Sequence, residues 1–118
     1  MFDFEKLDVY QLVHETNIKT LKLLYSTPAI DTDFKNQWKK ASLNMVLNLA
    51  EGTGRFSEAD KKHFMTIARG SVFECVALMK TAQEMGWISE SQQKDFYSNY
   101  EQISKMLLGM FRSYGNGK

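Results

Sequence analysis

The stretch that decides the fold is Asn48-Leu49-Ala50-Glu51-Gly52-Thr53-Gly54-Arg55-Phe56-Ser57. An apolar helical pattern runs into this stretch, and the two glycines then interrupt it. Because glycine commonly closes helices and serine opens them, the pattern predicts one helix that ends near Gly52 and another that begins after Ser57. We expect Gly52 or Gly54 to adopt the left-handed backbone conformation at this corner.

Apolar residues recur at helical spacing on both sides of the corner. The predicted helices span residues 7–26, 34–51, 58–85 and 90–114. Pro28 ends the first helix, Gly86 ends the third, and Ser89-Glu90-Ser91-Gln92 forms a capping box for the fourth. Four helices joined by short connections predict an all-α fold, an antiparallel up-down-up-down four-helix bundle.

The first two helices carry a large amount of apolar surface. One face of the first is lined by Leu7, Tyr10, His14, Ile18, Leu21 and Tyr25. Besides the face of Trp38 and Met45, the second helix has another apolar face, made by Leu43, Val46, Leu47 and Ala50. A helix that is apolar nearly all round is buried on both sides. We expect a second copy of the chain to cover the extra face; the alternative is that the other three helices surround it.

The composition indicates an ordinary globular protein with a single domain over residues 1–118. Of the chain, 43% is hydrophobic and 25% is charged, and the formal charge of +1 argues against a generic polyanion binder. Cys75 is the only cysteine, so no intrachain disulfide forms. The acidic, aromatic first residues do not resemble a signal peptide, and no apolar run reaches the roughly 20 residues that span a bilayer. We expect a cytoplasmic protein without membrane contact.

The sequence contains no constellation typical of an enzyme, a metal site or a cofactor site. His14 lies in the apolar stripe of the first helix, where a lone histidine is more typical of a core or interface. Asp60-x-x-His63 provides a single ligand pair, whereas di-iron bundles need two such pairs and two further carboxylates. Cys75 is predicted to be a small buried hydrophobe. Gly52-Thr53-Gly54-Arg55 lacks the lysine and hydroxyl residue of a phosphate-binding loop.

Two polar groups of residues remain. The first group is Asn48, Glu51, Ser71 and Glu74. We predict that it forms a hydrogen-bonded tie between the second and third helices, with a ligand pocket as the alternative. The second group is basic, and its candidates for phosphate contact are Lys39, Lys40, Arg55, Lys62 and Arg69. The alternative is that these side chains are solvated charges beside neighbouring acidic residues.

Two motifs give the chain a family resemblance. They are Leu49-Ala50-Glu51-Gly52-x-Gly54-Arg55-x-Ser57 and Ile67-Ala68-x-Gly70-Ser71-x-x-Glu74. With further similarity from Phe4 to Trp87, the chain resembles a family of small bacterial four-helix bundles encoded in intervening sequences of large-subunit ribosomal RNA genes. The resemblance implies a ring-shaped homopentamer. It also implies a relation to bundles that serve as accessory proteins of retroelement reverse transcriptases, where a basic ring surface meets nucleic acid.

The function predicted from these observations is binding without catalysis. We expect a homo-oligomeric bundle that binds structured RNA or a nucleoprotein through a basic patch repeated around the ring. Several copies of a modest patch bind more strongly together than one copy does. The alternative is a scaffold that docks a partner protein and binds no nucleic acid.

Overall fold

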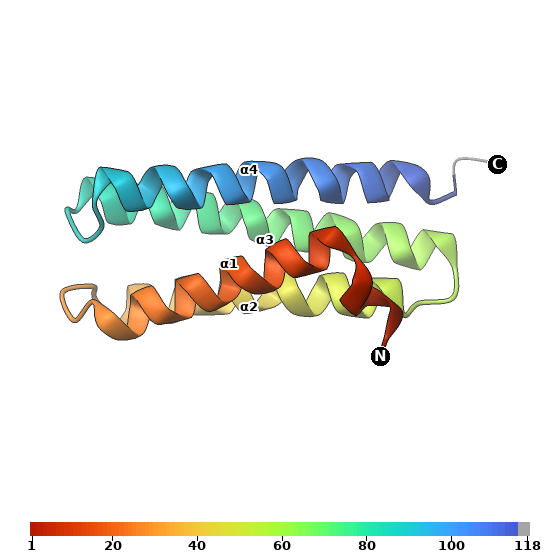
Figure 1. The fold of residues 1–118 in the computed structure, drawn as a ribbon, viewed down its shortest axis with the longest axis horizontal. Coiled ribbons are helices and arrows are strands. Elements are labelled where there is room, and N and C mark those ends of the chain that lie inside the picture. Colours follow the sequence, from red (N-terminus) through yellow and green to blue (C-terminus); the bar gives the residue numbers. More distant parts are fainter. Residues whose placement is uncertain (116–118) are drawn as a thin grey trace.

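The computed structural model describes residues 1–115, and within them it contains helices and no strand. A short 3-10 helix, η1 (Asp3–Lys6), precedes four α-helices. These are α1 (Asp8–Ser26), α2 (Thr32–Thr53), α3 (Glu58–Glu84) and α4 (Glu90–Ser113). The α1–α2 and α3–α4 turns lie at one end of the bundle, and the α2–α3 turn lies at the other (Figure 1). The predicted all-α four-helix fold is confirmed, with helix boundaries that differ from the prediction by at most two residues.

Each helix packs against two neighbours, since α1 and α3 both lie between α2 and α4. The centre of the bundle is filled by large side chains with less than 2% exposure. The largest are Trp38, Tyr100, Met45, Leu49, Met65, Met79, Ile103 and Leu107. The bundle is 49 Å long and 23 Å wide, so residues at its two ends are too far apart to share one site.

Local capping chemistry explains where the helices begin and end. The Asp31 carboxylate accepts the backbone N–H of Phe34 at 3.1 Å, which starts α2 two residues earlier than predicted. Ser89 and Gln92 form the complete capping box of α4. Gly86, at φ +77°, ends α3 in a Schellman motif in which the N–H of Trp87 donates to the carbonyl of Ala82 at 2.9 Å.

The conformation predicted for the glycine corner is wrong. Gly54 has φ −88°, Gly52 is helical, and the positive-φ glycines of residues 1–115 are Gly86 and Gly115. Gly52 is required for a different reason. A Cβ at this position would lie 2.5 Å from Cε of Met65 and 2.7 Å from Cβ of Phe64. The glycine therefore allows α2 and α3 to approach closely.

The face of α1 that points inward is more polar than the sequence suggested. Thr16, Asn17 and Thr20 are buried, whereas Tyr25, from the predicted apolar stripe, is 75% exposed. Partners on other helices satisfy the buried groups: Ser42 Oγ donates to Asn17 Oδ1 at 2.7 Å. Similarly, Asn99 Nδ2 donates to Thr16 Oγ1 at 3.2 Å, and Thr20 Oγ1 lies 3.4 Å from Tyr100 Oη.

Candidate functional site

A single copy of the chain does not gather the five predicted basic residues. Lys39 and Lys40 lie in the first half of α2, and Arg55 lies in the α2–α3 turn at the opposite end of the bundle. Lys62 and Arg69 lie along α3. The patch predicted from the sequence is therefore split into two parts within one chain.

Most of these cations lie over aromatic rings. Lys39 Nζ lies 5.3 Å from the ring centroid of Tyr25 and donates to its hydroxyl at 3.2 Å. Arg55 forms an ion pair with Glu51 at 2.6 Å and lies 4.7 Å from the ring of Phe64. The remaining pairs are Lys62 over Phe111 at 4.6 Å and Arg69 over Phe73 at 4.9 Å. Such cation–π contacts hold the long side chains in place and leave hydrogen-bond donors free.

The predicted polar tie does not form among the residues that the structure describes. Asn48 donates to the carbonyl of Asn44 in its own helix at 2.8 Å. Glu51 is exposed and accepts from Arg55, and Glu74 is exposed as well. Ser71 is buried on α3, so the four side chains do not form the predicted group. The buried side-chain hydrogen bonds that join helices lie instead around Asn17 and Tyr100.

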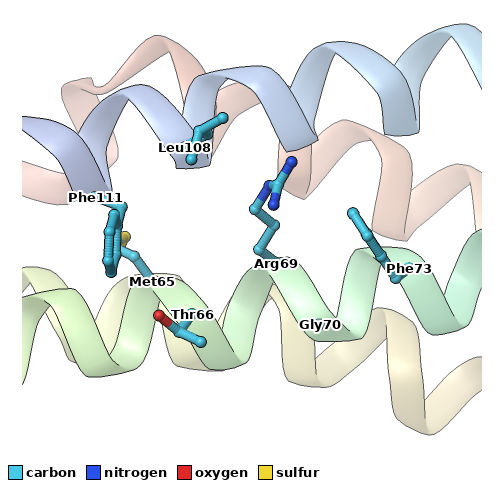
Figure 2. A pocket seen from close by; sticks show the side chains of 7 residues that line it. All are labelled: Met65, Thr66, Arg69, Gly70, Phe73, Leu108 and Phe111. Atoms are coloured by element: carbon cyan, nitrogen blue, oxygen red, sulfur yellow. The ribbon is translucent and has the colours of Figure 1, made fainter.

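A groove runs between α3 and α4 on the outside of the bundle. Its first part encloses about 280 Å³ and is lined by Met65, Thr66, Arg69, Gly70, Phe73, Leu108 and Phe111. In Figure 2, Arg69 reaches from α3 toward α4, with Phe73 on one side and Leu108 and Phe111 on the other. The Arg69 Nε donates to the carbonyl of Ser104 at 3.2 Å, which fixes the guanidinium across the groove.

The hollow continues along the same two helices. A second part shares Phe73 with the first and adds Val76, Ala77, Tyr97, Glu101 and Ser104. A third part shares Tyr97 and Glu101 and adds Lys80, Gln93, Lys94 and Ser98. We call the whole the α3–α4 groove. The sequence predicted Arg69 as a binding residue but did not predict the groove. The pattern that could have indicated the groove is Arg69, followed directly by Gly70 and four residues later by the aromatic Phe73.

An exposed apolar surface covers the outside of the other helix pair. The hydrogen bond between Asn17 and Ser42 fixes the register of α1 against α2. With this register, helical geometry places the extra apolar residues of both helices on adjoining outer faces. They are Tyr10, His14, Ile18, Leu21 and Tyr25 of α1 and Leu43, Val46, Leu47 and Ala50 of α2. We call them the α1–α2 face; Leu47 is 54% exposed, Leu43 43% and Ile18 37%.

Two titratable groups in the core, Cys75 and Tyr100, have raised pKa values because they are buried. Burial raises the pKa of the Cys75 thiol to about 12, so this thiol stays protonated at neutral pH. Burial also raises the pKa of Tyr100, whose hydroxyl accepts from Trp38 Nε1 at 3.2 Å. His14 is exposed and stacks on Tyr10, so a core position for it is wrong. Within residues 1–115, no three His, Cys, Asp or Glu side chains are grouped as metal ligands.

In the part of the chain that the structure describes, no helix has both the length and the apolar character to cross a bilayer.

Comparison with known proteins identifies the fold and a family. The sequence profile of the 23S rRNA-intervening sequence protein family matches residues 5–109. A crystal structure of a protein of unknown function from the S23 ribosomal protein family of Bacteroides thetaiotaomicron superposes with a TM-score of 0.82. That protein is 17% identical, and the match covers 88% of this chain and 98% of the other, so the likeness concerns the fold. No curated protein matches the sequence.

Proposed function

The chain belongs to the 23S rRNA-intervening sequence protein family, and we propose that it is a non-enzymatic, self-assembling bundle that binds RNA through its basic side chains. The observation that carries this proposal is that four of the five predicted cations have no carboxylate partner among residues 1–115. Among residues 1–115, the ion pairs hold Lys19, Arg55 and Lys61. Lys39, Lys40, Lys62 and Arg69 have no carboxylate partner there, so their charge is available to phosphates.

Such cations make contacts that do not depend on base sequence. Lysine and arginine neutralise phosphates and release counterions, which makes the affinity fall as the salt concentration rises. Few cations act within each copy, so strong binding depends on several copies acting together. Strong RNA binding therefore depends on assembly of the chain.

The α1–α2 face supports the proposal that the chain assembles. It exposes large apolar side chains over two adjacent helices, which is typical of surfaces that a partner covers. We propose that a second copy covers it and, from the family resemblance, that the copies close into a ring of five. We place this assembly in the cytoplasm, because Cys75 is buried and no disulfide is needed for the fold.

A salt series with labelled structured RNA tests RNA binding. The change is the double charge reversal Lys39→Glu with Lys40→Glu, and the control reverses two other exposed lysines, Lys6→Glu with Lys22→Glu. We expect the first variant to bind more weakly, and the logarithm of its affinity to fall less steeply with the logarithm of the salt concentration. RNA affinity that ignores salt would contradict the proposal, whereas equal losses in both double variants would exclude Lys39 and Lys40 as the RNA contact.

The second candidate function is a scaffold for a partner protein, and the α1–α2 face favours it as well. In that case a different protein covers the face, and the purified chain stays a monomer. Light scattering at micromolar concentration separates the two functions. A pentamer mass supports self-assembly, whereas a monomer mass, together with no affinity for RNA at low salt, supports the scaffold.

A further inference from the structure

The α3–α4 groove combines features that suit an unpaired nucleic-acid strand. Three cation–aromatic pairs follow it: Lys62 over Phe111, Arg69 over Phe73, and Lys80 over Tyr97 at 5.3 Å. From the first cation to the last, α3 rises by roughly 27 Å at about 1.5 Å per residue. The groove is therefore long enough for several nucleotides.

The aromatic rings remain available for stacking despite their cations. Phe73 is 55% exposed and Tyr97 is 40% exposed, although both belong to a helix pair that buries its other face. Base–aromatic stacking needs no particular base, but it needs bases that are not already paired. Cations that contact the backbone beside rings that contact the bases are the general arrangement of single-strand binding sites.

The charges along the groove argue against a second copy of the chain as its occupant. None of the nine residues of the α1–α2 face is acidic, so docking this face would bury Arg69 without a carboxylate. Burying an uncompensated charge is strongly unfavourable. A polyanion, in contrast, supplies a phosphate for each cation. Glu101 is the acidic residue that lines the groove, and its charge opposes such a ligand.

We propose that the α3–α4 groove binds single-stranded RNA, with Lys62, Arg69 and Lys80 on phosphates and Phe73 and Tyr97 stacked on bases. This inference rests on the proposed function and gives it a site and a ligand class. The main RNA contact then lies on α3 and α4, and not at Lys39 and Lys40 of α2. In a ring, the α1–α2 face of one copy meets a different surface of the next copy. The groove stays open because the α1–α2 face offers no carboxylate to Arg69, so the groove is not that surface.

Fluorescence anisotropy with labelled oligouridylate, and with a hairpin RNA of equal length, tests the site. Phe73→Ala should weaken oligouridylate binding about tenfold and leave the salt dependence unchanged, because it removes stacking and no charge. Arg69→Gln should weaken binding and also reduce the salt dependence by about one phosphate contact. Glu101→Gln should strengthen binding. Phe56→Ala, which changes a fully exposed phenylalanine in the α2–α3 turn, is the control and should have no effect.

The possible outcomes separate this inference from the function on which it rests. If no RNA binds, both fail. If RNA binds and only Lys39→Glu with Lys40→Glu weakens it, the proposed function stands and the groove is wrong. If Phe73→Ala lowers the mass of the assembly in light scattering, the groove is an interface between copies and the inference is overturned. If oligothymidylate binds as strongly as oligouridylate, the groove accepts single-stranded DNA as well as RNA. That result would overturn the proposal that the ligand is specifically RNA.

Discussion

Replacing Gly52 by alanine tests how α2 and α3 are held together. The added Cβ would lie 2.7 Å from Cβ of Phe64, which is fixed to the backbone of α3, and 2.5 Å from the flexible end of Met65. Met65 can turn aside, but Phe64 can move only if the two helices separate. Overpacking of this kind costs about 1–3 kcal/mol.

Alanine also brings a gain, because glycine inside a helix is about 1 kcal/mol less favourable than alanine. The net effect expected for Gly52→Ala is therefore a loss of about 1 kcal/mol in the free energy of unfolding. Gly109→Ala is the matched control. Gly109 is an exposed helical glycine with no atom within 4 Å of an added Cβ, so this variant should gain stability.

Urea unfolding followed by circular dichroism, at one fixed protein concentration, measures both variants. We expect Gly52→Ala and Gly109→Ala to differ by about 2 kcal/mol, with opposite signs relative to the parent chain. If Gly52→Ala were as stable as Gly109→Ala, the close approach at Gly52 would not be what requires a glycine, and the account of the corner would be refuted.

Three further predictions concern the core and the outer surface. Tyr100→Phe leaves the buried Trp38 Nε1–H without its acceptor and should cost about 1–3 kcal/mol in urea unfolding; Tyr97→Phe, on the exposed side of α4, should cost little. Burial raises the pKa of Cys75 from 9.0 to about 12, so the unfolded chain loses this proton first. Stability should then fall as the pH rises from about 9 toward 12, and Cys75→Ala should make that fall shallower; an unchanged slope would contradict the assignment. Leu43→Glu with Leu47→Glu should reduce the mass in light scattering to that of a monomer with unchanged helical content, and an assembly that persists would exclude the α1–α2 face as the interface.

Much of the fold follows from signals within single helices. Asp31, Ser57 and Ser89 each cap a helix through a bond to a backbone N–H three residues ahead, and Gly86 ends α3 at positive φ. Such contacts are local in sequence, so the pattern alone predicts them. The predicted helix start after Ser57 is confirmed, since the Ser57 hydroxyl accepts from Asp60 N–H at 3.0 Å.

The features that the sequence did not predict correctly all depend on contacts between helices. A glycine between two helices either adopts positive φ or permits the helices to pack closely. The sequence is the same in both cases, so it did not reveal that Gly52 has the second role. The inward side of α1 could not be predicted because the partners that make Thr16, Asn17 and Thr20 tolerable in the core lie on α2 and α4. The groove was missed for the same reason, since its rings come from α3 and α4 together.

The separation of the two outer surfaces determines how assembly and binding are coupled. If copies meet through the α1–α2 face, breaking that contact leaves each α3–α4 groove intact. The monomeric variant Leu43→Glu with Leu47→Glu should then bind a short oligouridylate, which fills one groove, as well as the parent chain does. A long RNA that spans several grooves should lose the gain from multivalency, which is about 10²- to 10⁴-fold in favourable geometries. Equal losses for the short and the long RNA would mean that the interface itself forms part of the binding site.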